Sequence, residues 1–319
     1  MQTEFPELEF VHLNGYKLKY GSSKWCTIFK IILQIPKILI AINRENRWLR
    51  NYTKSKHLDL IIADNRYGLR HPHIISVFIT HQLLIKTSLG TLADRLIQQI
   101  NYRYINRFNE CWVPDAAGAI NLAGALSHPA VLPATPLTYI GIQSRINKAV
   151  TPATHSLLIL LSGPEPQRSI IENILLQQLT QYHYPAVLVR GLPGASAITN
   201  APPGVTAFNH LAGSQLQHAI NAADIIISRS GYSTIMDVLP LGKKCILVPT
   251  PGQAEQEYLA TWLSHKNYAC IGFQHHLSLP ALIEKAMQLQ LPPLAALKDD
   301  GLAAAAIERL IQQLSNQPS

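Results

Sequence analysis

The chain has 319 residues, of which 47% are hydrophobic and 14% are charged. This composition supports a substantial buried core and excludes global disorder, and the length suits two domains of ordinary size. The formal net charge of +8 favours an anionic partner. The basic residues are spread out, however, so we expect no nucleic-acid ligand. The strongest local excess, at residues 44–56, is either a solvated helix face or a binding patch.

The four cysteines, Cys26, Cys111, Cys245 and Cys270, are far apart and form no CxxC pair. This spacing predicts free thiols in a reducing compartment and no metal site. The first ten residues are acidic and lack the apolar core of a signal peptide. No uninterrupted apolar run reaches the roughly 18 residues that a membrane-spanning helix needs. We therefore expect a cytoplasmic protein.

In chain order, the first half opens with a strand-like run at residues 9–13 and an amphipathic helical stretch at 27–43, which Pro36 should kink or split. Apolar runs then predict strands at 58–63, 74–79, 110–113 and 137–141, with a helix at 89–108. The polar residues 143–155 read as a hinge. We therefore predict an N-terminal domain at 1–142 and a C-terminal domain at 156–319.

The second half alternates strands with helices. Strands are expected at 157–161, 186–190, 205–208, 224–228 and 244–248, and helices at 169–182, 214–222, 234–241, 279–289, 301–314 and from 254 onward. Such alternation predicts parallel sheets built from βα units.

Residues 223–258 are the most informative stretch. They hold two apolar strands, each followed by a polar loop and a helix start. Open α/β sheets bind ligands at the carboxyl ends of their strands, and a helix that begins after a Gly/Ser turn offers free N–H groups to phosphate. Asp237, one turn into the first of these helices, is placed to accept hydrogen bonds from two ribose hydroxyls.

This order of motifs resembles the C-terminal domain of glycosyltransferase family 28, a family of GT-B glycosyltransferases. The matching residues are Ser228-Arg229-Ser230-Gly231, Ser233-Thr234, Asp237, Leu241-Gly242-Lys243, Val248-Pro249 and Gln253 to Tyr258. The resemblance implies the GT-B fold, an α/β architecture in which two Rossmann-like domains with parallel sheets face each other across a cleft. It implies transfer of an N-acetylhexosamine or hexose from a UDP-sugar to a lipid-linked or glycan acceptor. No DxD triplet occurs, which agrees with a metal-independent site without a cofactor.

The resemblance also assigns donor-binding roles. Asp237 stands where the family has an acidic residue, usually Glu, that grips the ribose. Gln256 and Glu257 align with polar residues that hold the sugar hydroxyls, where the family often has two glutamines, so Glu257 points to a different donor sugar or is simply exposed. Asp237 also fits the favourable position of an acid in a first helical turn.

Other donor-side positions have a structural alternative each. Arg229 either meets a phosphate or the uracil ring or is an ordinary surface arginine, and Ser233 and Thr234 either bind or cap their helix. Ser162 and Gly163 align with the family's diphosphate loop, which Pro164 and Pro166 stiffen here. Arg190, at the end of the strand at 186–190, either faces the cleft or has a purely structural role. The remaining donor-side candidates are Ser230, Gly231, which lets the backbone approach a ligand, and Gln253.

In the first half, His81 and Asp64 end two successive strands. An imidazole ordinarily titrates near pH 6.5, so His81 is a candidate general base, with a structural or solvent-exposed histidine as the alternative. Asp64 is the second catalytic candidate. The two belong together if their strands are neighbours in one sheet.

The resemblance predicts a glycine-rich loop with a histidine after a first strand, and the chain has none before Phe10. We therefore expect a chain without its first βα unit, with low activity and poor solubility. Two other functions stay open: an impaired nucleotide-sugar-binding subunit that needs a partner chain, and an epimerase acting on a UDP-sugar. Residues 27–42 either lie on an anionic bilayer, at the inner face of the plasma membrane, or pack on the sheet.

Overall fold

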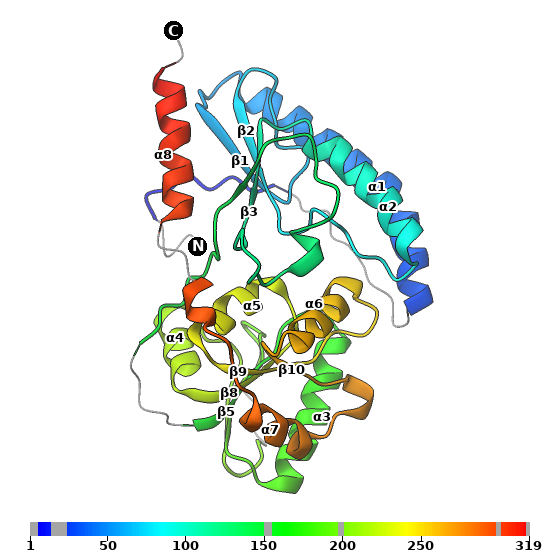
Figure 1. The fold of residues 1–319 in the computed structure, drawn as a ribbon, viewed down its shortest axis with the longest axis vertical. Coiled ribbons are helices and arrows are strands. Elements are labelled where there is room, and N and C mark those ends of the chain that lie inside the picture. The colour runs from blue at the N-terminus through cyan, green and yellow to red at the C-terminus, as the bar shows by residue number, and fades with distance from the viewer. Residues whose placement is uncertain (1–5, 14–23, 150–154, 197–200, 298–300, 317–319) are drawn as a thin grey trace.

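A computed structural model describes residues 6–13, 24–149, 155–196, 201–297 and 301–316, without the side chains of residues 24–35, 155–156 and 295–296. The chain forms two α/β units stacked along the long axis of the molecule (Figure 1). Each unit has its own parallel sheet. The expectation of two parallel-sheet domains is confirmed.

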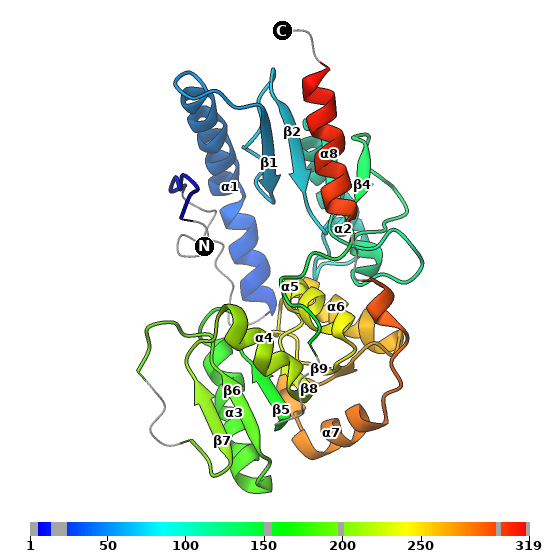
Figure 2. The same ribbon diagram turned by 90° about the vertical axis from the view of Figure 1, so that its left-hand side faces the viewer.

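The first sheet has four parallel strands in the order β1-β2-β3-β4. They are β1 (Leu60–Asp64), β2 (Ile75–Ile79), β3 (Glu110–Val113) and β4 (Leu137–Tyr139). Side chains alternate between its two faces. Phe78 packs with residues of α2 (Thr91–Ile105) on one face, and Val77 packs with Ala306 and Leu310 of α8 (Leu302–Ser315) on the other. Figures 1 and 2 show α8 against this sheet.

The second sheet has six parallel strands in the order β10-β9-β8-β5-β6-β7. They are β5 (His155–Leu160), β6 (Ala186–Val189), β7 (Val205–Phe208), β8 (Ala223–Ser228), β9 (Lys244–Leu247) and β10 (Cys270–Ile271). Its helices are α3 (Gln167–Tyr182), α4 (Gly213–Asn221), α5 (Tyr232–Val238), α6 (Ala254–His265) and α7 (Leu279–Gln288). β8 lies inside the sheet, covered on both faces, which explains its nearly continuous apolar sequence.

The first helix, α1 (Lys24–Tyr52), anchors the loop between β1 and β2. Glu45 is buried and accepts hydrogen bonds from Arg66 and from the backbone N–H of Gly68. A Cβ atom at Gly68 would lie 2.4 Å from the carbonyl oxygen of Ile42. Glycine therefore lets this loop approach the backbone of α1 closely.

The loop after β3 is organised by one carboxylate, that of the fully buried Asp115. It accepts hydrogen bonds from the backbone N–H groups of Ala116, Leu122 and Ala123, each at 2.9 Å, and from the hydroxyl of Ser127 at 2.6 Å. A buried carboxylate is tolerated when several donors replace its water shell. Asp115 thus folds residues 115–127, which we call the docking loop, around itself.

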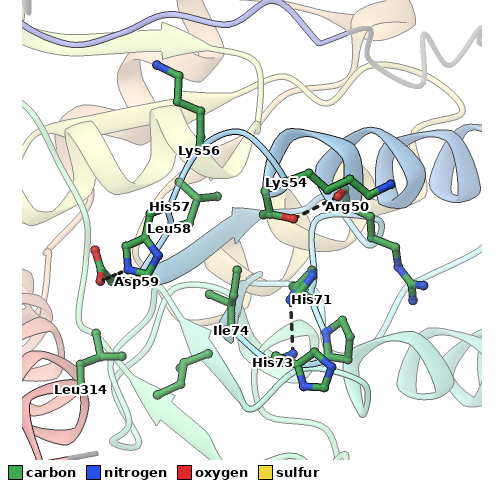
Figure 3. A pocket seen from close by; sticks show the side chains of 13 residues that line it. Arg50, Lys54, Lys56, His57, Leu58, Asp59, His71, His73, Ile74 and Leu314 are labelled. Carbon is green, nitrogen blue, oxygen red and sulfur yellow. Dashed lines mark hydrogen bonds and ion pairs between the residues drawn. The ribbon is translucent and has the colours of Figure 1, made fainter. Parts of the chain in front are cut away.

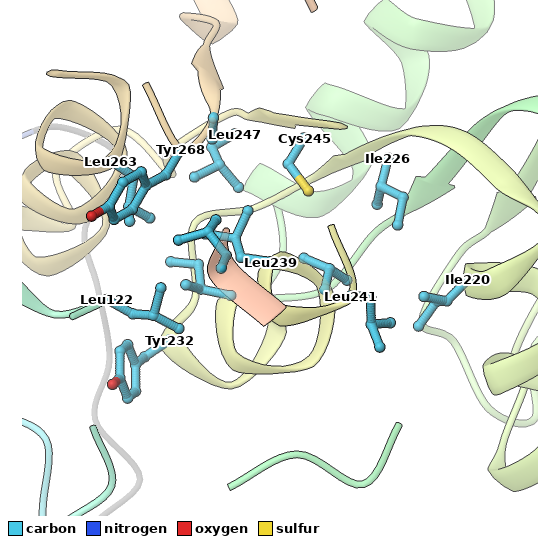
Figure 4. Close-up of a cluster of buried hydrophobic side chains, with 14 of the residues drawn as sticks. Leu122, Ile220, Ile226, Tyr232, Leu239, Leu241, Cys245, Leu247, Leu263 and Tyr268 are labelled. Atoms are coloured by element: carbon cyan, nitrogen blue, oxygen red, sulfur yellow. The ribbon is translucent and has the colours of Figure 1, made fainter. Parts of the chain in front are cut away.

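The docking loop belongs to the first unit by sequence but packs into the core of the second. Leu122 and Leu126 are fully buried in one cluster with Tyr232 of α5, Leu247 of β9 and Leu263 of α6 (Figure 4). Gly124, at φ +54°, has no room for a Cβ atom, which would lie 2.6 Å from the hydroxyl oxygen of Tyr258. The two units therefore share one hydrophobic core at this point.

Three expectations need correction. Residues 9–13 form no strand; Glu9 instead bonds to Tyr52 and Lys56 at the end of α1. The helix α1 is continuous through Pro36, because one missing hydrogen bond is tolerated within 29 residues. The proposed C-terminal domain, 156–319, extends only to about Leu297, which is buried in the core of the second unit, because α8 returns to the first sheet.

We predict that Asp115→Ala lowers the free energy of unfolding by at least about 2 kcal/mol, because buried N–H groups would lose their acceptor. Urea unfolding measures the change. Asp224→Ala, an exposed aspartate on β8, is the matched control and should change stability by less than about 0.5 kcal/mol. Equal stabilities of the two variants would contradict the organising role of Asp115.

Candidate active site

A hollow of about 310 Å³ lies where the second sheet ends at the carboxyl side of its strands. Its walls come from the loops after β5, β6 and β7 and from the helices α4 and α5. Of the predicted donor residues, it brings together Ser162, Thr234 and Asp237. Apolar side chains form most of the remaining wall, among them Leu161, Leu211, Leu216 and Ile220.

Asp237 is held by a residue of the inter-domain linker. Its Oδ1 atom accepts a hydrogen bond of 2.8 Å from the hydroxyl of Ser144. Oδ2 has no hydrogen bond among the described residues. Ser144 itself also contacts the backbone of Ile146, which is buried in the shared core. The linker thus supports one side of this carboxylate.

The loop at the end of β5 has a left-handed backbone at its glycine. Gly163 adopts φ +106° and nothing lies within 4 Å of the position of its missing Cβ. Gly191, after β6, adopts φ +69°, and a Cβ there would lie 2.3 Å from the carbonyl oxygen of Leu161. These two loops therefore pack directly on each other at the rim of the hollow.

Arg190 belongs to a buried ionic network rather than to open solvent. It donates to Glu172 at 2.6 Å and to Asn209 at 2.8 Å, and Glu172 also pairs with Arg168. Asn209 in turn donates to the carbonyl oxygen of Ala195. Arg190 therefore ties together the loops after β6 and β7, which form one wall of the hollow.

Arg229 is buried, with only 2% of its surface exposed. Its guanidinium donates to the carbonyl oxygens of Val248, Pro249 and Gln167 and to the side chain of Gln274 at 2.7 Å. Burial lowers its pKa to about 10. In the structure Arg229 lies neither at the surface nor in the expected ligand contact. Its guanidinium donors instead join the loops after β8, β9 and β5.

The residues around the start of α6 also bond to backbone. Ser230 is fully buried and donates to the carbonyl oxygen of Gln256. The Gln256 side chain accepts from the N–H of Thr250, and Glu257 accepts from the N–H of Gly252, both at 2.9 Å. These contacts fix the loop after β9.

The other predicted donor residues mark helix starts. Gly231 and Gln253 are the N-cap residues of α5 and α6, and neither makes a side-chain capping bond. Ser233 is exposed in the first turn of α5. The structure places these residues beside the two loops that the sequence motif singled out.

His81, after β2, reaches across to the second unit. Its Nε2 atom lies 2.8 Å from Oε1 of Glu255, in the first turn of α6, and its ring stacks on Tyr232 of α5 with 4.2 Å between centroids. The Tyr232 hydroxyl donates to the carbonyl oxygen of Pro114, and burial raises its pKa well above the usual value. Residues from both sheets thus meet here.

Asp64 ends β1, in register with Ile79 at the end of β2, so the two predicted catalytic residues do follow neighbouring strands. Asp64 is exposed, and its carboxylate accepts a hydrogen bond from Asn65. The described hydrogen-bond partners of His81 are Glu255 and Gln82, and Asp64 is not among them.

A larger hollow of about 710 Å³ lies at the opposite, amino-terminal edge of the first sheet (Figure 3). Its lining is basic and mostly exposed, with Arg50, Lys54, His71 and His73 among its residues. Lys56 and His57 there are paired with Glu9 and Asp59. This hollow contains none of the predicted site residues.

Within the described part of the chain, no three His, Cys, Asp or Glu side chains gather closely enough to hold a metal ion. The described helices include none long and apolar enough to cross a membrane. Cys111, Cys245 and Cys270 are free, buried thiols, as their spacing predicted. The side chain of Cys26 lies outside the described residues.

Sequence reasoning missed several residues of this site. Ser144 lies in the segment that was interpreted as a hinge. Glu255 lies within the motif Gln253 to Tyr258, but only its neighbours were assigned roles. Tyr232 lies between Gly231 and Ser233 and was assigned no role of its own. Each acts through a contact with the other unit. A single sequence carries no signal for such contacts.

The position of Arg229 gives a test. Arg229→Ala should lower the free energy of unfolding by about 2 kcal/mol or more, because buried carbonyl oxygens would lose their donor. Urea unfolding measures this, with the exposed Arg145→Ala as control. Unchanged stability combined with weaker UDP binding would instead make Arg229 a ligand contact.

Part of the second unit resembles a known protein family. Residues 205–314, about a third of the chain, match the glycosyltransferase family 28 C-terminal domain. Curated relatives include the UDP-N-acetylglucosamine–N-acetylmuramyl-(pentapeptide) pyrophosphoryl-undecaprenol N-acetylglucosamine transferases of Alkaliphilus oremlandii, 26% identical over 46% of this chain and 35% of that protein, and of Citrifermentans bemidjiense, 33% identical over 28% and 26%. The matched region thus spans about a third or less of these relatives.

Solved structures resemble nearly the whole chain. The kitacinnamycin glycotransferase matches with a TM-score of 0.57 at 17% identity, covering 88% of this chain and 83% of that one. MurG of Acinetobacter baumannii matches with a TM-score of 0.53 at 18% identity, covering 88% and 79%. Identities this low establish the fold alone. The chain therefore has the GT-B glycosyltransferase fold, with a C-terminal domain similar to that of glycosyltransferase family 28.

Proposed function

We propose that the protein is a hexosyltransferase that moves a sugar from a UDP-sugar to an acceptor in the cleft. The observation that carries the proposal is the hollow at the carboxyl ends of the second sheet, which gathers Ser162 of the loop after β5 with Thr234 and Asp237 of α5. Ligands of open α/β sheets bind at this edge. Seven of the 13 residues that line the hollow, Thr234 and Asp237 among them, lie within the family-matched region.

In this proposal the hollow holds the nucleoside of the donor. Its apolar walls suit a planar base, and the Asp237 carboxylate suits the paired ribose hydroxyls, since a carboxylate accepts two hydrogen bonds. Ser144 already donates to Oδ1 of Asp237. The ligand either bonds to the remaining oxygen, Oδ2, or replaces Ser144 at Oδ1. The proposed donor is UDP-N-acetylglucosamine, the sugar nucleotide in the names of the curated relatives.

The proposed reaction is a displacement at the anomeric carbon. The acceptor hydroxyl forms a bond to that carbon, the bond to the diphosphate oxygen breaks, and UDP leaves with the electron pair. The hydroxyl proton passes to a general base, for which we propose His81, because it lies where the two units meet. Arg229 does not donate to the diphosphate in this scheme, since both terminal nitrogens of its guanidinium donate to acceptors within the fold.

We further propose that the acceptor is lipid-linked and that the protein works at the inner face of a membrane. One face of α2 supports this: Leu92, Leu96 and Ile100 are exposed at helical spacing, with 75% of Leu92 accessible, and the exposed Leu89 precedes the helix. Arg95, Arg103 and Arg107 are exposed nearby and suit anionic headgroups. Most of the earlier candidate, residues 27–42, lies outside the described side chains.

Calorimetric titration tests donor binding. UDP-N-acetylglucosamine and UDP should bind the wild-type chain, and Asp237→Ala should weaken binding about ten- to a hundredfold, the value of hydrogen bonds to a charged group. Asp224→Ala, an exposed aspartate of the same domain, should bind as wild type. No heat with either ligand would refute the proposal, whereas binding without sugar transfer would favour the nucleotide-sugar-binding subunit.

Co-sedimentation with vesicles tests the membrane proposal. The double variant Leu92→Gln/Leu96→Gln should lose most of its binding to anionic vesicles, because two large apolar side chains would no longer enter the bilayer. Ile307→Gln/Ile311→Gln, which changes exposed apolar residues of α8, is the control and should bind normally. Equal binding by all three proteins would rule out the α2 face as the membrane contact.

A further inference from the structure

The contact between His81 and Glu255 joins an imidazole of the first unit to a carboxylate of the second. The separation of 2.8 Å between Nε2 and Oε1 is that of a charge-assisted hydrogen bond. The His81 side chain is 16% exposed and that of Glu255 34% exposed, so water reaches the pair only in part. Because water is partly excluded, this hydrogen bond is stronger than an ion pair on the surface.

The bond dictates where the proton of a neutral His81 ring resides. A carboxylate only accepts hydrogen bonds, so Nε2 must carry the hydrogen, and the lone pair is then on Nδ1. The side-chain nitrogen of Gln82 lies 3.3 Å from the same Nε2. It cannot donate there at the same time, and the shorter bond to a charged acceptor prevails.

The ring is also fixed in orientation. It stacks on Tyr232, and the hydroxyl of Tyr232 is anchored on the carbonyl oxygen of Pro114, just before the docking loop. Glu255 lies in the first turn of α6, where the helix dipole favours a negative charge. Among the described residues, Nδ1 of His81 has no hydrogen-bond partner, so its lone pair is available.

We propose that Glu255 is a positioning residue that holds His81 in the Nε2–H tautomer and so presents Nδ1 as the proton acceptor. The inference rests on the proposed transferase function for its catalytic meaning. Because the two residues belong to different units, the base is set only while the units have this mutual arrangement. Proton transfer from the acceptor hydroxyl then goes to Nδ1, and the imidazolium that forms is stabilised by the Glu255 carboxylate.

Long-range ¹H–¹⁵N spectra of the full chain, labelled at its 13 histidines, test the tautomer directly. The signals of His81 are identified by their loss in His81→Gln. At pH 8 the wild type should show His81 as the Nε2–H tautomer, and Glu255→Ala should move it towards the exchange average of a free imidazole. The exposed Glu284→Gln should leave it unchanged. An Nδ1–H tautomer in the wild type, or no change in Glu255→Ala, would overturn the assignment.

Steady-state UDP release from UDP-N-acetylglucosamine, with a lipid diphosphate acceptor, gives the kinetic test. His81→Gln should lower kcat by about 10²- to 10⁴-fold, the usual contribution of a general base. Glu255→Ala should lower kcat by about ten- to a hundredfold with the donor KM unchanged, and Glu255→Gln, which still offers an acceptor oxygen, should recover part of that loss. A wild-type kcat in Glu255→Ala would refute the positioning role. Absence of donor binding by the wild type would refute the transferase function while leaving the tautomer result valid.

Discussion

The buried carboxylate of Asp115 determines how the two halves of this molecule meet. By gathering three backbone N–H groups and one hydroxyl, it folds the docking loop into a compact projection. That projection carries Leu122 and Leu126 into the core of the second unit. The apolar surface buried there favours one arrangement of the two sheets, since hydrophobic burial is the largest favourable term in such contacts.

Two groups of side chains depend on that arrangement. The linker that follows the first unit brings Ser144 to Asp237, on the wall of the hollow. The end of β2 brings His81 to Glu255 and Tyr232, at the starts of α6 and α5. In the proposed function, one sheet builds the donor-binding surface and the other delivers the base, which is what a group-transfer enzyme of two domains requires. The partly buried Arg190 and the buried Arg229 keep the loops at the carboxyl ends of the second sheet in place.

The strands were largely predictable from the sequence, because buried parallel strands are short apolar runs that end at Gly, Pro or Asp. The strands β3 and β7 begin and end at the predicted residues. The failures have a common physical cause. Whether residues 9–13 form a strand depends on their contacts with the end of α1, 40 or more residues away. The return of α8 to the first sheet depends on the face of that sheet that carries Val77 and Trp112. Neither condition is local in sequence.

The site shows the same division. Its position followed from strand ends, and Ser162, Thr234 and Asp237 do line one hollow. The side-chain roles were harder to predict. The sequence does not distinguish an arginine that contacts a ligand from one that, like Arg229, donates to four acceptors of its own chain. A histidine likewise shows its carboxylate partner only after folding.

A crystal structure of the chain with UDP would test the central claim most directly. The account predicts uridine in the hollow between the β5 loop and α5, with the ribose hydroxyls within hydrogen-bond distance of the Asp237 carboxylate. UDP bound elsewhere, such as in the basic hollow beside Arg50 and His71, with Asp237 still bonded only to Ser144, would contradict it.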